Sequence, residues 1–212
     1  MKHKLLALAG ASLFILVSGL FSCGWDCGPF HTKFNVVGLE WHNFKAIYDV
    51  TSENKLMLSE IETDSVAYNQ YAINIQPEIE TYSAQTMDRW DFSLIQSAYA
   101  CDPPTLTTDE TIDSIVIVAE TDFDLTHSSG IDLSDLFDIV IRDDASGKWF
   151  EKYDLDDYLA THPNVPTNMT LILKERPGVT SDFEFLVKYY QKGLGTNDYF
   201  EFTTDKVVIT RE

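Results

Sequence analysis

The chain has 212 residues, of which 44% are hydrophobic and 13% aromatic, enough for one globular domain or two small ones. This composition excludes a wholly disordered protein. The 34 acidic residues outnumber the 15 basic ones, and the formal charge is −19 at pH 7. Phosphate backbones repel a surface of that charge, so we expect no nucleic-acid partner.

The chain begins with the layout of a secretory signal peptide. Basic side chains at positions 2–4 precede an apolar run from Leu5 to Val17. That run is shorter than the roughly 20 residues of a membrane-spanning helix, so we expect cleavage rather than a permanent span. The stretch Leu20-Phe21-Ser22-Cys23 that follows resembles the lipobox of bacterial lipoproteins.

This resemblance implies that Cys23 carries a covalent diacylglycerol and acyl chains and becomes the mature N-terminus. Two or three such chains hold a protein on a membrane without a spanning helix. We therefore predict a lipoprotein signal peptide over residues 1–22, a lipidated tether over 23–33 and a body over 34–212. In the alternative interpretation, Cys23 is an early cysteine of a secreted domain that is cleaved elsewhere.

Two cysteines remain, Cys27 and Cys101. In a chain exported to an oxidising compartment this even pair favours a disulfide, worth about 4 kcal/mol in the chain-entropy model. Two separate cysteines are the alternative. The sequence has no Cys-x-x-Cys pair and no His-Glu-x-x-His segment, and its five histidines are scattered. We therefore predict no metal site.

From Phe34 onward, short runs of alternating apolar and polar residues are separated by turn residues, the pattern of half-buried strands. The clearest run, Phe183 to Tyr190, sends Tyr189 to its apolar face and Tyr190 to the opposite one. A turn-forming stretch, Lys192 to Asp198, follows it. The predicted strands are 34–41, 44–50, 65–75, 112–119, 136–141, 169–174, 183–190, 199–202 and 207–210.

One short helix is predicted. Asp154 can cap its N-terminus, and Leu155, Tyr158 and Leu159 form one apolar stripe before His162-Pro163 ends it. A single helix cannot supply the crossovers of a parallel sheet, so about nine short strands favour two sheets packed face to face. We therefore predict a mainly β fold, a two-layer immunoglobulin-like β-sandwich with one short helix.

The best internal boundary is Asp102-Pro103-Pro104. A division of the body near residues 100–110 is the alternative to one joint sandwich. The stretch Met87 to Tyr99 fits helical and strand spacing equally well and is assigned to neither.

The segment Ser97-Ala98-Tyr99-Ala100-Cys101-Asp102-Pro103-Pro104, followed by the strand-like Ile112 to Ile117, resembles an uncharacterised group of Bacteroidetes envelope lipoproteins. The resemblance covers the leader and much of residues 97–210. It implies a lipid-anchored protein of the cell envelope, at the outer membrane, with a β-sandwich-like body and no established activity. It implies no catalytic residue.

Two tripeptides, Asp64-Ser65-Val66 and Asp113-Ser114-Ile115, look like the pattern that receives O-glycans in this bacterial group. Ser65 and Ser114 are therefore candidate glycan acceptors. The alternative is that Asp and Ser simply begin strands at both places, with Ser114 inside a paired edge that a glycan cannot reach.

The sequence carries no Gly-x-Ser-x-Gly elbow, phosphate loop, dinucleotide fingerprint or zinc-helix motif, so we predict no enzymatic activity. Paired acids at 122 and 124, 143 and 144, and 156 and 157 could serve a glycosidase, but such pairs arise by chance among 34 acids. Calcium is an unsupported option, because His127 and Leu133 occupy the Gly and Glu positions of an EF-hand loop begun at Asp122.

Aromatic residues are the other candidates for binding, although in strands they usually fill the core. Trp149, next to a turn, is the tryptophan expected to be partly exposed. We predict a non-enzymatic binding or structural module that contacts protein or glycan, with the membrane reached through the lipid anchor. The alternatives are a lipid-anchored glycoside hydrolase using a carboxylate pair, and a protein that assists an outer-membrane complex.

Overall fold

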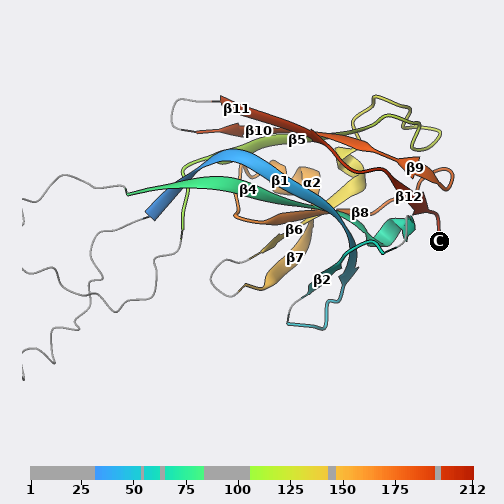
Figure 1. Cartoon of the computed structure of the whole chain (residues 1–212), viewed down its shortest axis with the longest axis horizontal. Coiled ribbons are helices and arrows are strands. Elements are labelled where there is room, and N and C mark those ends of the chain that lie inside the picture. Colours follow the sequence, from blue (N-terminus) through green and yellow to red (C-terminus); the bar gives the residue numbers. More distant parts are fainter. Residues whose placement is uncertain (1–31, 54, 63–64, 84–105, 143–146, 194–196) are drawn as a thin grey trace, which may run out of the picture. The chain divides into compact units, whose positions relative to one another are not determined.

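The computed structural model describes residues 32–53, 55–62, 65–83, 106–142, 147–193 and 197–212 (Figure 1). The chain divides into two units, one of residues 1–30 and 85–104, the other of residues 31–84 and 105–212. Only the second unit is described below. The predictions for the leader, Cys23, Cys27, Cys101, the stretch 87–99 and the 102–104 boundary lie outside the described residues.

The described part is mainly β, with one short α-helix, as the strand pattern predicts. Its strands are β1 (Thr32–Tyr48), β2 (Leu56–Ser59), β3 (Ser65–Ala67), β4 (Tyr71–Ser83), β5 (Thr111–Ala119), β6 (Phe137–Arg142), β7 (Trp149–Asp154), β8 (Met169–Leu173), β9 (Ser181–Phe183), β10 (Phe185–Lys192), β11 (Asn197–Thr203) and β12 (Val207–Thr210). The helix is α2 (Leu155–Leu159), and two 3-10 turns are η1 (Tyr68–Gln70) and η2 (Ser134–Leu136).

These strands form three sheets (Figure 1). A six-stranded sheet has the order β2-β1-β4-β8-β6-β7 and is antiparallel throughout. Two three-stranded sheets have the orders β11-β10-β5 and β3-β12-β9. In the last of these, β3 and β12 run parallel. Strands from both sides of residues 84–105 therefore pair within one sheet, since β4 lies against β8.

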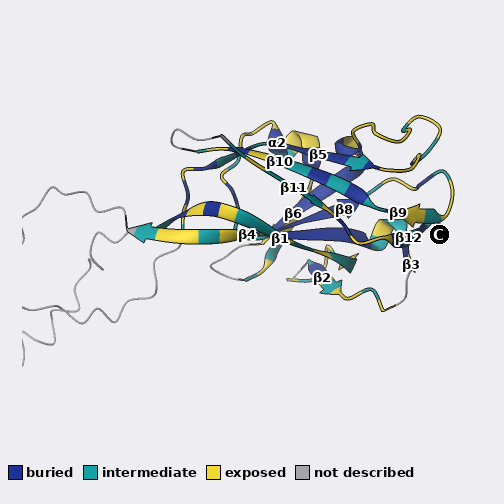
Figure 2. Ribbon diagram, turned by 45° about the horizontal axis from the view of Figure 1, so that its top comes forward, coloured by how far each residue is buried: buried dark blue, intermediate teal, exposed yellow. Residues whose placement is uncertain are grey.

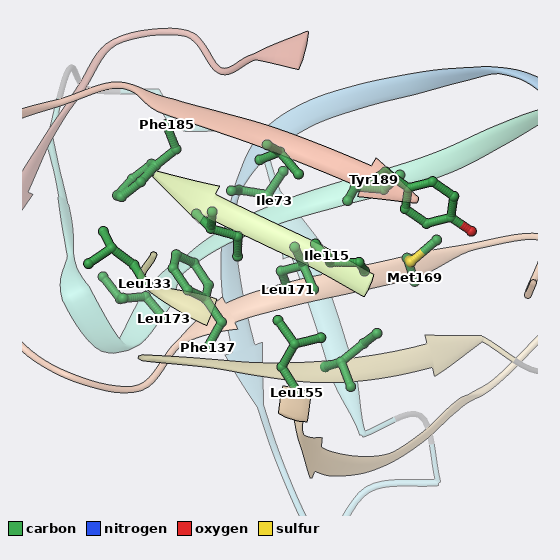
Figure 3. Packing of buried hydrophobic residues seen from close by; sticks show 14 of the residues in the cluster. Ile73, Ile115, Leu133, Phe137, Leu155, Met169, Leu171, Leu173, Phe185 and Tyr189 are labelled. Carbon is green, nitrogen blue, oxygen red and sulfur yellow. The ribbon is translucent and has the colours of Figure 1, made fainter. Parts of the chain in front are cut away.

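One hydrophobic core joins all three sheets (Figure 3). Ile73 of β4, Phe137 of β6 and Leu171 of β8 point from the six-stranded sheet toward Ile115 of β5 and Phe185 of β10. All five side chains are almost completely buried. Burial of each such side chain contributes on the order of 2 kcal/mol, so this core is the main source of the fold's stability.

A second, smaller core lies on the opposite face of the six-stranded sheet. It contains Ala46, Leu56, Ala72, Val140 and Ile172. Because successive residues of a strand point to opposite faces, β4, β6 and β8 supply side chains to both cores. Their central residues are consequently buried on both sides, unlike the half-buried strands that the alternating pattern predicts.

The two edge strands of the six-stranded sheet approach each other around the second core (Figure 1). The Lys55 ammonium pairs with the Glu151 carboxylate at 2.8 Å, and the backbone N–H of Lys152 donates to the Tyr48 hydroxyl at 3.0 Å. Lys148 also pairs with Glu53 at 2.7 Å. Side chains therefore link the β2 and β7 edges across the small core.

The longest pairing joins β1 and β4 in a two-stranded ribbon that continues past the end of β8 (Figure 2). The register shifts between Val36 and Gly38, and Val37 is the extra, exposed residue of this β-bulge. Before the bulge the even-numbered Phe34 and Val36 face the main core, and after it Leu39 does. The bulge thus resets which side chains point inward.

The strand predictions hold best at the C-terminal end. Strands β5, β6, β8, β10, β11 and β12 lie close to their predicted bounds. The predicted 34–41 and 44–50 strands are one continuous β1, the 65–75 strand is interrupted by η1, and the 183–190 strand divides at Glu184. Strands β2 and β7 were missed, because both are short edge strands with largely exposed residues.

The predicted helix and its cap are confirmed. The Asp154 carboxylate accepts hydrogen bonds from the backbone N–H groups of Asp156 and Asp157 at 3.0 and 3.4 Å. Leu155 and Leu159 are buried in the main core. His162 then adopts a positive φ of 49°, which ends the helical path before Pro163.

A buried carboxylate fixes the bulged start of β1. Glu110 precedes β5, is only 5% exposed, and accepts a hydrogen bond from the backbone N–H of Val36 at 2.8 Å. The neighbouring Phe34 N–H donates to the Thr107 carbonyl at 3.0 Å. Burial raises the pKa of Glu110 despite the hydrogen bond from Val36. Its ionised form is therefore less favourable in the folded chain than in the unfolded one.

We expect Glu110→Gln to keep the acceptor for Val36 and Glu110→Ala to leave that N–H without it. The Ala variant should unfold with a free energy about 1–3 kcal/mol lower than the Gln variant in urea titrations at pH 7. Because the folded pKa of Glu110 is raised, the wild type loses stability relative to the Gln variant as pH rises through that pKa. Equal stability of both variants would contradict this role.

Candidate functional site

The outer face of the β11-β10-β5 sheet gathers exposed aromatic and charged side chains. On β10 the core-facing Val187 and Tyr189 are buried, and the alternate residues Lys188 and Tyr190 point outward. The register places Tyr190 opposite Tyr199 of β11 on one side and Ser114 of β5 on the other. We call this surface the tyrosine face; its members are Ser114, Val116, Leu186, Lys188, Tyr190, Lys192, Tyr199 and Glu201.

Two tyrosine rings form the centre of this face. The Tyr190 and Tyr199 rings have centroids 4.8 Å apart and are tilted by 38°, and the side chains are 37% and 46% exposed. The Tyr199 hydroxyl donates to the Glu201 carboxylate, and this bond raises the pKa of Tyr199 to about 12. Tyr199 therefore stays a protonated phenol at neutral pH, with ring surface turned to solvent.

Opposite charges flank the tyrosines on both sides. One step along the strands, Lys188 lies directly opposite Glu201 in the register. On the other side the Lys192 ammonium pairs with the Asp113 carboxylate. The tyrosine face is therefore locally balanced in charge, although the whole chain carries −19.

The two candidate glycan acceptors lie on different sheets. Ser114 is half-buried within β5, next to Tyr190. Ser65 is the first residue of β3, is exposed, and lines a surface hollow of about 450 Å³ together with Lys45, Glu60 and Gln70. Ser65 begins β3, as the alternative interpretation expects, whereas Ser114 lies inside β5; neither position bears on whether a glycan is attached.

Two of the acids considered for catalysis build a loop. Asp124 accepts hydrogen bonds from the backbone N–H groups of Thr126 and His127 at 2.7 and 2.8 Å, and from the Thr126 hydroxyl at 2.7 Å. Asp122 accepts one from the backbone N–H of Ser129 at 2.8 Å. Burial acts to raise the pKa of Asp124, but these bonds from Thr126 and His127 outweigh it and hold the pKa well below its usual range.

The other acid pairs are Asp156 with Asp157 and the pair at 143 and 144. Asp156 and Asp157 lie in the first turn of α2, and burial together with Asp154 raises the pKa of Asp156. Residues 143 and 144 lie outside the described part. Within the described ranges, His, Cys, Asp and Glu side chains form no group of three or more that could hold a metal ion.

The two tryptophans of the described part, Trp41 and Trp149, lie outside the tyrosine face. Trp149 is half-buried against the second core, which agrees with the partial exposure expected for it. Trp41 of β1 stacks on Phe202 of β11, with ring centroids 5.2 Å apart. Sequence reasoning assigned aromatic residues to the core by default and so missed the tyrosine face. The signal was available, because alternation sends Tyr190 outward and the turn-forming stretch after it predicts a hairpin, in which Tyr199 lies beside Tyr190.

Comparisons with known proteins leave the family open. No protein-family model matches the chain, and no curated protein matches it significantly. One solved structure is similar, the C-terminal domain of the AgI/II polypeptide BspA of Streptococcus agalactiae, with 10% sequence identity and a TM-score of 0.24. The alignment covers 81% of this chain and 49% of that one, so the chain spans about half of that structure's length. In the described part, no helix is long and apolar enough to cross a membrane.

We expect Asp124→Ala to lower the free energy of unfolding by about 1–2 kcal/mol at pH 7, because several hydrogen bonds of the loop lose their acceptor. Asp122→Ala removes one such bond and serves as the milder comparison. Since the folded pKa of Asp124 is lowered, the wild-type advantage over Asp124→Asn should be complete above about pH 4 and shrink as pH falls further. Urea titrations between pH 5 and pH 2 measure it.

Proposed function

We propose that the protein is an envelope lipoprotein that is anchored through lipid on Cys23 and presents its body as a non-enzymatic binding or structural module for protein or glycan. The proposed location is the outer membrane. The signal-peptide layout, the lipobox-like residues 20–23 and the resemblance to Bacteroidetes envelope lipoproteins support the anchor. A disulfide between Cys27 and Cys101 and glycans on Ser65 and Ser114 stay predictions.

We also infer that the body is a two-layer sandwich of immunoglobulin-like type. Support comes from the main core, to which β4, β6 and β8 contribute from one side and β5 and β10 from the other. Such sandwiches are common in extracellular and cell-surface domains, where sheet faces and end loops carry the binding residues.

The tyrosine face is the observation that carries the binding role. In strands, tyrosines usually pack in the core or in cross-strand pairs, yet Tyr190 and Tyr199 both pair with each other and keep much of their surface exposed. Exposed aromatic rings beside polar groups are typical of interaction surfaces. Three of the described acids instead serve structure: Asp124 and Asp122 order a loop, and Asp154 caps α2. This division of roles favours binding over hydrolysis.

The anchor is tested by metabolic labelling with palmitate. We expect the wild-type chain to incorporate label and to fractionate with membranes, and Cys23→Ala to lose both properties, because the acyl chains supply the membrane affinity. Cys27→Ala is the matched control and should be labelled like the wild type. Undiminished labelling of Cys23→Ala would overturn the proposed anchor.

The absence of turnover is tested on purified full-length protein in detergent. Binding to a panel of purified envelope glycans and envelope proteins is measured alongside release of reducing sugar from the same glycans. We expect binding that the double variant Tyr190→Ala, Tyr199→Ala weakens about tenfold or more, with no sugar released. Sugar release by the wild type that Asp122→Asn or Asp156→Asn abolishes would instead establish a glycoside hydrolase.

A further inference from the structure

We propose that the tyrosine face binds the uncharged sugar rings of a glycan, stacked on Tyr190 and Tyr199. This inference rests on the proposed binding role and names its ligand class. It is drawn from the ring geometry, the polar groups around the rings and the local charge balance.

The tyrosine pair offers the apolar half of such a site. A sugar ring has one face made mainly of C–H groups, which leaves water favourably when it lies against an aromatic ring. The Tyr190 and Tyr199 side chains are 37% and 46% exposed on adjacent strands, with their centroids 4.8 Å apart. Pairing across the strands restricts both rings, so less conformational freedom is lost when a ligand covers them.

The surrounding side chains offer the polar half. Sugar hydroxyls both donate and accept hydrogen bonds, so a site for them needs both kinds of partner. Glu201 accepts from Tyr199 and keeps further lone pairs for a sugar hydroxyl. The ammonium of Lys188, opposite Glu201 in the register, is a donor for such a hydroxyl. On the far side of Tyr190 lies the Ser114 hydroxyl, which can do either. Lys188 and Glu201 lie two residues along their strands from Tyr190 and Tyr199, on the same sheet face, and Ser114 lies directly opposite Tyr190.

Charge selects among glycans. Lys188 lies opposite Glu201 in the register and Lys192 pairs with Asp113, so two lysines and two carboxylates balance here and no excess of positive charge favours an anionic ligand. A uronate, sialylated or phosphorylated glycan would also meet the field of a chain with net charge −19. Uncharged hexose or N-acetylhexosamine rings meet neither penalty, and they are the ligand class to which the proposal commits.

Binding of something other than a glycan to the tyrosine face would give different experimental results. A second copy of the chain would bury the tyrosines in a dimer that the Tyr→Ala variants dissociate. A protein partner would need the same tyrosines but would show no affinity for free oligosaccharides. Both are separate outcomes of the experiment.

The test uses the full-length protein in detergent and isothermal titration with hexasaccharides of glucose, mannose and N-acetylglucosamine, with a galacturonic acid hexasaccharide as the charged counterpart. We expect at least one neutral hexasaccharide to bind about tenfold or more tightly than the uronate, which corresponds to about 1.4 kcal/mol. Tyr190→Ala and Tyr199→Ala should each weaken that binding about tenfold or more. Tyr199→Phe, which keeps the ring, should weaken it less than Tyr199→Ala.

Tyr153→Ala is the matched control. Tyr153 lies on β7 of the six-stranded sheet, is 47% exposed and has the ring of Tyr158 of α2 beside its own. This variant should leave sugar binding unchanged, and thermal unfolding should confirm that each variant is folded. Absence of binding to every neutral hexasaccharide, preference for the uronate, equal loss in Tyr153→Ala, or a dimer that dissociates in Tyr190→Ala would each overturn the proposal. If oligosaccharides fail but an envelope protein binds through the tyrosines, the binding module stands and its ligand class is wrong.

Discussion

Burial of β4 on both faces is the constraint on which the rest of the described structure depends. Its odd-numbered residues Ile73 and Ile75 enter the main core, while Ala72 enters the second core. It pairs with β1 along one edge and with β8 along the other. Loss of this strand would separate β1 and β2 from β8, β6 and β7 and expose two cores at once. The tyrosine face depends on it indirectly, because β5 and β10 are positioned by the core that β4 helps to form.

Capping residues and hydrophobic alternation predicted the elements whose formation depends mainly on residues close together in the sequence. The α2 cap was found because Asp154 sits one position before an apolar stripe, and the β10–β11 hairpin because alternation continues on both sides of a turn-forming segment. The unbroken course of β1 could not be found in this way. The predicted break falls at the polar His42 and Asn43, yet in the structure both residues stay paired with β4, opposite Asn74 and Ile73. Strands β2 and β7 exist because the sheet curls around Ala46 and Val140, which is a tertiary effect.

Only part of the candidate site could be predicted from the sequence. Tyr190 and Tyr199 are separated by a single turn, so their pairing follows from the hairpin. The neighbour on the other side, Ser114, comes from a strand more than seventy positions earlier, and a register shift at Tyr190/Gln191 decides which β5 residue faces it. Composition gives the charge of the chain as a whole. The local compensation of Lys192 by Asp113 appears only when the strands are assembled.

The approach of β2 and β7 has a consequence for how the protein behaves at high concentration. Bare strand edges are templates on which other chains can add, and such addition leads to aggregation. Here the two edges lie close to each other, and the Lys55–Glu151 ion pair and the hydrogen bond from the Lys152 N–H to the Tyr48 hydroxyl connect them. Because each edge strand covers the other, neither is accessible for a strand of a second chain to pair with, which disfavours fibrous aggregation.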